Sequence, residues 1–468
     1  MNGEAEPLSL PAEATPTRAA VGLGSAGGAS LRRVVWSLAW PVIVTMLSES
    51  LVGLVDMLMV SRLGPAAVAG VGVGAQILGG VSVTMTAVGT GTLALVARYV
   101  GARHKAQAER VLGQSVLAAF ALACVVIVPV IAWPYELVRL FGVEPNVVVQ
   151  GGAFVRVVML AIPASAVSFV IASALRGAGD TRTPLAIGLV VNALNVLGNW
   201  VFIFGKLGFP ALGVRGSGVA TTLAFTSGMA LGLWLLARGR LRLRLGWGDL
   251  RFHFSTIRRV LSIGSPAAVE QGMMQVGFFV YLLFAARYGT DAVAAYFIGV
   301  RILALSFLPG FGFAAAAAAL VGQNLGAGKP DAAEHSGWLA NWMSVALMSA
   351  TGVFAFVFSE PIARLFVDQE TVIAGTASFI HMLAFSQPLM AMDFTLGGAL
   401  RGAGDTRFPL LTVLIAFYGC RLGFAFVVVS LLGLGLPWLW AALIPDYIMR
   451  ATLKAWRFRR GTWKTIAV

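Results

Sequence analysis

Five acidic residues lie within long apolar stretches of the sequence, where an ionisable side chain is costly and usually functional. They are Glu49, Asp56, Glu270, Asp393 and Asp446. A carboxylate held away from water can bind a hard cation such as Na⁺ together with neighbouring oxygen atoms, or it can take up and release a proton. These five acids are therefore candidates for the binding and exchange of a small cation.

Polar residues of two other predicted helices lie at about the same depth in the membrane as Asp56. Asn192, Asn195 and Asn199 follow one another at i, i+3 and i+7, so they share one face of a second predicted helix. At a rise of ~1.5 Å per residue, Asp56 and Asn199 lie near the outer ends of their helices, and Thr221 lies in the outer half of a third. We predict that Asp56, Asn195, Asn199 and Thr221 form a cation-coupling site that binds Na⁺ or H⁺. The alternative is a polar network that only holds the helices together.

The remaining acids suggest a cavity for a cationic substrate. Glu49 lies seven residues before Asp56, on the same face of the first predicted helix. An acidic pocket with Met and aromatic side chains suits flat apolar cations. We predict that this cavity is lined by Glu49, Asn192, Glu270, Met274, Tyr281, Met390, Asp393 and Asp446. Two alternatives remain open: the acids of the second half could pair with Arg301 or Arg421, and the methionines could be ordinary packing.

The composition places these residues in a membrane. Hydrophobic residues make up 58% of the 468 residues and charged residues only 12%, about half the share in soluble domains. These polar side chains are too few to cover the surface of a soluble protein of this length, which excludes a soluble enzyme, a nucleic-acid-binding protein and a disordered protein. Cys124 and Cys420 both lie in apolar stretches and offer no disulfide framework or metal spacing.

Twelve apolar runs of about 20 residues recur along the chain, each long enough to cross ~30 Å of hydrocarbon as a helix. Their approximate centres are Thr45, Val81, Cys124, Ser165, Ala193, Ser227, Gly277, Ala315, Ala350, Phe385, Phe417 and Tyr447. Most of the 34 Lys and Arg residues fall in segments that are cytoplasmic if the N-terminus is inside. We therefore interpret the net charge of +14 as a topology signal, and predict a multi-pass protein of the bacterial inner or plasma membrane with both termini cytoplasmic.

The chain contains an internal duplication. The nonapeptide Ala174–Arg182 recurs unchanged at Ala399–Arg407, at an offset of 225 residues. Six helices per copy give both copies the same orientation, so an axis along the membrane normal should relate them. We predict an all-α integral membrane protein with two six-helix bundles. Its segments would be a disordered tail (1–30), an N-lobe (31–237), a cytoplasmic basic linker (238–259), a C-lobe (260–456) and a cytoplasmic tail (457–468).

These features resemble the multidrug and toxic compound extrusion (MATE) family over about residues 34–464. The resemblance is carried by the repeated segment Leu175–Arg182 and by the helix segments and loops Val55–Val60, Asn195–Gly205, Pro210–Val214, Gly218–Thr221 and Arg457–Lys464. It implies export of organic cations and toxic compounds, driven by inward flux of Na⁺ or H⁺. By the same resemblance, Asp56 corresponds to the coupling residue. Asn195 and Asn199 stand where sodium-linked relatives carry an Asn and an Asp, and Thr221 stands where a hydroxyl ligand would be.

We therefore predict a secondary active antiporter that works by alternating access between two bundles. Its partners would be cationic or amphipathic drugs and the lipid bilayer, not nucleic acid. We expect a monomer that needs no cofactor beyond the coupling ion. One alternative is a flippase for a lipid-linked saccharide, whose diphosphate would need basic residues such as Arg156, Arg301 and Arg421, the cations that fall within the apolar runs. A membrane-embedded enzyme is disfavoured because the four His residues are scattered.

Overall fold

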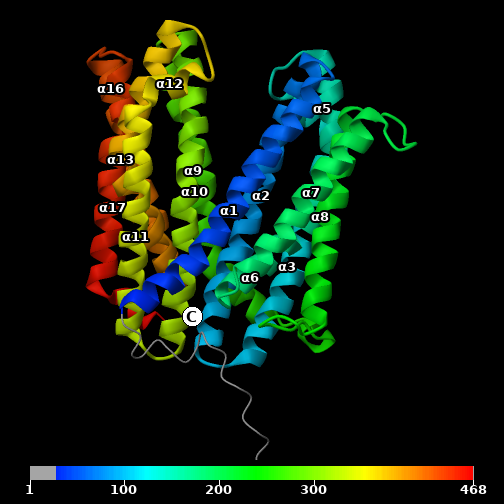
Figure 1. The fold of residues 1–468 in the computed structure, drawn as a ribbon, viewed down its shortest axis with the longest axis vertical. Coiled ribbons are helices and arrows are strands. Elements are labelled where there is room, and N and C mark those ends of the chain that lie inside the picture. The colour runs from blue at the N-terminus through cyan, green and yellow to red at the C-terminus, as the bar shows by residue number, and fades with distance from the viewer. Residues whose placement is uncertain (1–27, 467–468) are drawn as a thin grey trace, which may run out of the picture.

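The computed structural model describes residues 28–466, and every regular element in that range is a helix (Figure 1). Eleven helices of this part of the chain are long and apolar enough to cross a membrane. In chain order they are α1 (Gly28–Ser61), α2 (Pro65–Gly101), α3 (Lys105–Ala132), the run of α5 (Pro145–Val158), η1 (Met159–Ala161) and α6 (Ile162–Gly177), α7 (Arg182–Phe204), α8 (Val214–Ala237), α9 (Phe254–Ala286), α10 (Thr290–Gly326), α11 (Pro330–Val357), α13 (Glu370–Gly402) and the run of α14 (Arg407–Val413), η3 (Leu414–Leu422), α15 (Gly423–Phe426) and η4 (Val427–Leu431).

The twelfth predicted helix is also present, but it is charged. It consists of α16 (Leu436–Ala441) and α17 (Leu443–Arg460), which close the second bundle. Asp446, Arg450 and Lys454 follow one another at intervals of four on α17, and all three side chains are buried. Charges of both signs on one buried face keep this helix below the hydropathy of the other eleven. The predicted fold class, twelve helices in two repeated bundles, is confirmed.

The backbone repeats with the offset of the sequence. Two short helices, α4 (Pro134–Arg139) and α12 (Ser359–Arg364), occupy equivalent places in the two halves. Equivalent glycines adopt the same left-handed turn conformation: φ is 106° at Gly64 and 93° at Gly289. Such φ values favour glycine because a Cβ would collide with the backbone. We call α1–α8 the amino lobe, and α9–α17 with η5 (Thr462–Thr465) the carboxyl lobe.

The helices extend further than the predicted segment boundaries. Residues 1–27 of the predicted tail lie outside the described residues, and α1 already begins at Gly28. The connection between the lobes is 238–253, with the short helix η2 (Trp247–Leu250), because α9 begins at Phe254 rather than after 259. Similarly, α17 continues past 456 to Arg460. A membrane helix can extend beyond the hydrocarbon, and its last turns can then carry basic residues. The charge pattern alone assigns such residues to loops, so the predicted helices are too short.

The lobes contact each other near the end of the molecule at which the described chain starts and finishes, which we call the terminal face. A Cβ on Gly101 of α2 would collide with the Gln323 carbonyl of α10, and one on Gly326 would collide with the Arg98 carbonyl. Equivalent residues also donate across this contact: Arg98 donates to the Ala403 carbonyl (3.2 Å), and Gln323 donates to the Gly177 carbonyl (2.7 Å), one residue before the equivalent of Ala403. Small residues permit such close packing of helices. Towards the opposite face the ribbons of the two lobes diverge (Figure 1).

Helix α1 packs against both lobes. Its first turns pack in a core with carboxyl-lobe residues: Val35 and Ala39 are fully buried in the same cluster as Phe313. Beyond Pro41, which interrupts the helical hydrogen bonding, α1 contacts α7 of the amino lobe. The two candidate site residues of α1, Glu49 and Asp56, lie on this second part. A movement of one lobe relative to the other therefore acts directly on α1.

Candidate functional site

The four residues of the predicted cation-coupling site meet at one place in the amino lobe. Asn199 Nδ2 of α7 donates to Asp56 Oδ1 of α1 at 2.5 Å and to Asn195 Oδ1 at 3.2 Å. Asn195 Nδ2 lies 3.1 Å from Thr221 Oγ1 of α8, whose hydroxyl donates to the Ser217 carbonyl at 2.9 Å. The spacing of four places both asparagines on one side of α7. Three helices therefore contribute to a single polar cluster, which we call the Asp56 cluster.

The hydrogen bonds of the Asp56 cluster conflict with one another. The amide oxygen of Asn195 lies 3.0 Å from both carboxylate oxygens of Asp56, so acceptors face each other. Rotating this amide by 180° makes it a donor to Asp56, but brings its nitrogen to 3.2 Å from Asn199 Nδ2. The buried Asn199 Oδ1 has no hydrogen-bond partner among residues 28–466. A positive species between these oxygens, either a proton on Asp56 or a small hard cation, would remove the conflict.

The chemistry of this donor set favours an exchangeable ion. The cluster contains one carboxylate, with amide and hydroxyl oxygens as the remaining candidate ligands. No group of three or more His, Cys, Asp or Glu side chains placed to hold a metal ion occurs within residues 28–466. One negative charge matches a monovalent cation or a proton better than a tightly held divalent metal.

A cavity of about 450 Å³ lies in the amino lobe and adjoins the Asp56 cluster through Thr221. Its polar lining includes Thr45, Glu49, Ser165, Arg176, Asn192 and Thr221. Phe169, Phe225 and Met85 supply apolar walls. The volume falls within the usual range for drug-sized ligands, ~300–1,000 Å³. Of the residues predicted for the substrate cavity, Glu49 and Asn192 line this one.

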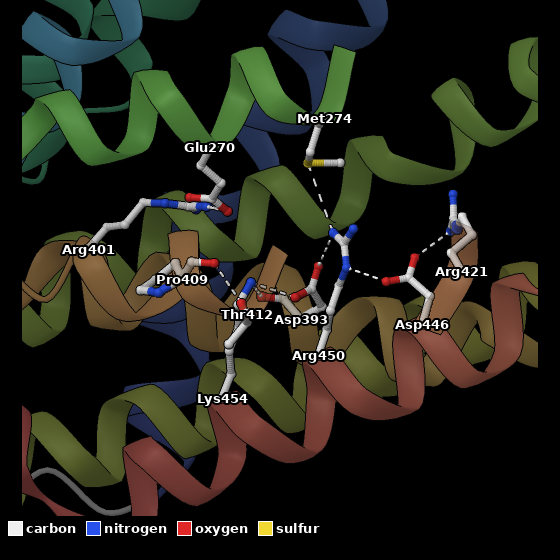
Figure 2. Close-up of polar contacts among 10 residues, drawn as sticks. All are labelled: Glu270, Met274, Asp393, Arg401, Pro409, Thr412, Arg421, Asp446, Arg450 and Lys454. Carbon is white, nitrogen blue, oxygen red and sulfur yellow. Dashed lines mark hydrogen bonds and ion pairs between the residues drawn. The ribbon is translucent and has the colours of Figure 1, made fainter. Parts of the chain in front are cut away.

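The acids of the carboxyl lobe are held in ion pairs instead of lining an open acidic cavity (Figure 2). Glu270 Oε1 of α9 lies 2.7 Å from Arg401 Nη2 of α13. Asp393 Oδ1 lies 2.5 Å from Lys454 Nζ, and Asp393 Oδ2 lies 3.7 Å from Arg450 Nη1. Neither Glu270 nor Asp393 lines the amino-lobe cavity, and their role in a substrate cavity stays a prediction. Burial removes the water that would otherwise solvate these charges, so the acids take basic partners.

Asp446 is paired in the same way. Its Oδ1 lies 2.7 Å from Arg450 Nε on the same helix, and its Oδ2 lies 2.8 Å from Arg421 Nη2, which belongs to the π-helical segment η3. The alternative of an ion pair with Arg421 is correct for this residue, and its cavity role stays a prediction. For Glu270 and Asp393 the partners are different ones, and Arg301 is not among them.

Three partners were missed by the sequence analysis: Arg401, Arg450 and Lys454. A signal was available for two of them, because Asp446, Arg450 and Lys454 have the spacing of one helical face. Arg401 lies in the second copy of the nonapeptide. The sequence analysis placed only three basic residues within the apolar runs, and this number was too low.

Tyr281, Met390 and Met274 lie in the carboxyl lobe and do not line the amino-lobe cavity, so their predicted cavity role stays a prediction. Tyr281 is buried, donates to the Leu439 carbonyl at 2.5 Å, and has its ring 5.7 Å from the Arg421 guanidinium. Met390 is fully buried in the carboxyl-lobe core, where it is ordinary packing. Met274 Sδ lies 3.9 Å from Arg450 Nη1 (Figure 2). Tyr281 and Met274 therefore contact the bases of the ion pairs, as aromatic rings and thioethers can do favourably.

Two duplicated bundles, with a polar cavity and a buried cluster around a carboxylate inside one of them, define a membrane transporter of the parallel-repeat class. The MatE family model matches residues 41–201 and 266–427, two segments that begin one repeat offset apart. A probable multidrug resistance protein NorM from Thermotoga maritima is 30% identical over 443 residues, which cover 94% of each chain. An uncharacterized transporter, YisQ, from Bacillus subtilis is 27% identical, over 92% of this chain and 94% of its own.

Solved structures share the fold. A MOP superfamily transporter from Pyrococcus furiosus superposes with a TM-score of 0.86 at 22% identity, covering 93% of this chain and 97% of its own. A structure described as the outward-facing conformation of a multidrug resistance MATE family transporter gives 0.85 at 22% identity, over 92% and 95%. The chain belongs to the MATE family of multi-pass membrane transporters.

Proposed function

We propose that the protein is a multidrug efflux antiporter that exports amphipathic organic compounds in exchange for an inward flux of Na⁺ or H⁺. The observation that carries the proposal is that the Asp56 cluster and the amino-lobe cavity share Thr221. A cation site and a ligand cavity with a common wall can influence one another. The names of the NorM relatives support drugs as the transported compounds.

Exchange requires that the ion and the drug favour different packings of the helices around them. Loading the Asp56 cluster would draw α1 towards α7 and α8, because Asp56 is its contribution from α1. The same three helices bound the cavity together with α2 and α6, so a closer packing of α1, α7 and α8 would disfavour the bound drug. Glu49 and Asn192 line the cavity from α1 and α7 and would respond to the same change.

The close contacts of Gly101 with Gln323 and of Gly326 with Arg98 support a state that is closed at the terminal face. With both termini cytoplasmic, as the basic residues indicate, that state is outward-open and would release drug and load the coupling ion. The inward-open state would need the Gly101–Gly326 contact region to separate. We expect a monomer to suffice, because the cavity and the Asp56 cluster both lie within one lobe of one chain.

The flippase alternative is not favoured. A diphosphate would need unpaired basic side chains in a central cavity. The buried bases Arg421, Arg450 and Lys454 are instead neutralised by acids of the same lobe.

Proteoliposomes loaded with the fluorescent cation rhodamine 123 test the proposal. Sodium and proton gradients are imposed separately on the wild type, on Asp56→Asn, and on Asp368→Asn as a control at an exposed site. We expect one gradient to drive dye movement in the wild type and in the control. Asp56→Asn should stay folded, bind dye and lose the gradient-driven flux. Undiminished gradient-driven flux in Asp56→Asn would refute the assignment.

A further inference from the structure

A second cavity, of about 310 Å³, lies at the terminal face between helices of both lobes. Tyr99 lines it from the last turn of α2, and Arg110 from the second turn of α3. Ser255, Thr256 and Arg259 line it from the first two turns of α9. All of these residues lie near the ends of membrane helices, so the cavity lies where the helices leave the hydrocarbon. This is the depth of the lipid headgroups.

The cavity is positively charged. Arg259 Nη1 donates to the Tyr99 hydroxyl at 3.1 Å, which fixes its guanidinium at the cavity wall. Among residues 28–466, Arg110 has no ion pair and no acid lines the cavity. Glu109 is held elsewhere, because it accepts from the Arg244 backbone N–H at 2.7 Å and lies 3.7 Å from Lys105. The long helix α9 also begins here, and the first N–H groups of a helix attract anions. The cavity therefore suits an oxyanion.

The two arginines are specific to this place in the molecule. The repeat offset puts His335 and Asn324 of the carboxyl lobe where the amino lobe has Arg110 and Tyr99. On the same carboxyl-lobe helix as His335, Asp331 and Glu334 lie 3.3 and 2.6 Å from Lys464. That surface is thus acidic and already paired. The basic lining is therefore not a by-product of the duplicated helices.

Exposed aromatic residues indicate that the neighbouring segment lies in a membrane surface. Trp247, Phe252 and Phe254 are 90%, 70% and 66% exposed, and all three lie in the connection between the lobes or at the start of α9. Aromatic rings are favoured at the boundary between water and lipid. The segment 238–259 also contains seven arginines and one acid, Asp249, and anionic lipids attract such basic segments. These features favour a lipid over a dissolved phosphate compound.

We propose that Tyr99, Arg110, Arg259 and the first turn of α9 bind the phosphate group of an anionic phospholipid in the leaflet at the terminal face. Both guanidinium groups would donate to phosphate oxygens, for which their planar shape is suited. The acyl chains would remain in the bilayer.

The bound lipid would join the two lobes. Tyr99 and Arg110 belong to the amino lobe and Arg259 to the carboxyl lobe, so one phosphate would contact both at the face where they pack closely. Such a lipid would stabilise the state that is closed at the terminal face. The inference depends neither on the transported compound nor on the coupling ion.

Lipid binding to the purified full chain tests the inference. The protein in detergent is titrated with phosphatidylglycerol, or with phosphatidylcholine of the same acyl chains, and bound lipid is counted by native mass spectrometry. Glycerol 3-phosphate serves as the soluble probe. We expect the wild type to retain one phosphatidylglycerol in clear preference to phosphatidylcholine, and glycerol 3-phosphate to compete only weakly.

Variants locate the site. Arg110→Gln and Arg259→Gln should each weaken the binding of phosphatidylglycerol by about 10-fold, the scale of losing a hydrogen bond to a charged group. Arg110→Lys should keep part of the affinity. Arg258→Gln is the matched control, because Arg258 is exposed on the same turn of α9 and does not line the cavity. It should bind the lipid as the wild type does. The melting temperature of each variant without lipid shows that it is folded.

Three results would overturn the inference. Equal retention of the two lipids by the wild type would mean that the cavity does not recognise an anionic headgroup. An equal loss in Arg258→Gln and Arg110→Gln would mean that diffuse charge, and not this cavity, attracts the lipid. Binding of glycerol 3-phosphate as tight as that of the lipid would assign the cavity to a soluble phosphate compound. None of these measurements uses a gradient or a dye, so the antiport proposal is tested separately.

Discussion

The ion pair between Lys454 and Asp393 gives a quantitative prediction. Lys454→Met removes the ammonium 2.5 Å from Asp393 Oδ1 and leaves only Arg450, 3.7 Å away and already paired with Asp446. The two side chains are 2% and 4% exposed, so water cannot replace the lost partner. Breaking a buried pair typically costs about 3–5 kcal/mol. Because Arg450 remains nearby, we expect a loss of about 3 kcal/mol in the free energy of unfolding.

The double variant Asp393→Asn/Lys454→Met should be more stable than Lys454→Met alone, because it leaves no unpaired carboxylate. We expect it to recover about 2 kcal/mol or more of the loss. Measuring the single variant Asp393→Asn as well completes a double-mutant cycle and gives the coupling energy of the pair. Unfolding by sodium dodecyl sulfate in mixed micelles, followed by the fluorescence of the 12 Trp residues, provides the assay.

The surface pair of Arg364 and Glu370 is the matched control. Its contacts of 2.7 and 3.0 Å are equally short, but the side chains are 50% and 71% exposed. Glu370→Gln should therefore give no measurable change, since solvent screens exposed pairs. A Lys454→Met protein as stable as the wild type would refute the reasoning, as would a double variant no more stable than the single one. The folded double variant should also keep its gradient dependence, because Asp56 is proposed to carry the coupling.

Other changes test the Asp56 cluster and the contact between the lobes. Asn199→Asp adds a second carboxylate beside Asp56 and should raise the apparent affinity for Na⁺ about 10-fold, since ligand charge tunes cation affinity; an unchanged Na⁺ dependence of dye flux would contradict this. Thr221→Ala removes one oxygen and should raise the cation concentration needed for half-maximal flux several-fold, with folding intact on size-exclusion chromatography. Gly326→Ala places a methyl group against the Arg98 carbonyl and should slow transport strongly. Gly72→Ala, which meets nothing within 4 Å, is its control; equal rates in the two variants would exclude a packing role for Gly326.

Much of the fold could be predicted from the sequence because its signals are local or periodic. Length and hydropathy define eleven membrane helices among the described residues, and the repeated nonapeptide with its fixed offset defines the two bundles. The assembly of the Asp56 cluster also followed from depth, because Asp56, Asn199 and Thr221 were counted from helix ends that bear basic residues or tight turns.

The pairing of charges across helices could not be predicted in the same way. Depth along a helix does not say which faces meet, so Glu270 and Asp393 lacked visible partners. The rotation of each helix about its own axis decides which side chains pair. Lys454 faces α13 because α17 buries the side that carries its charged residues. The same limit applied to Glu49 and Arg176, whose common cavity depends on how α1 packs beside α6.

The division of α1 between the lobes makes this helix a lever. Its first turns are clamped in one half of the molecule, while the acid that would sense the ion lies on the far arm in the other half. A rotation of one lobe relative to the other would displace the second part of α1, and ion binding at Asp56 would in turn affect the packing of its first turns. Ion binding and lobe orientation would then be coupled directly through helix α1, without a chain of intermediate residues.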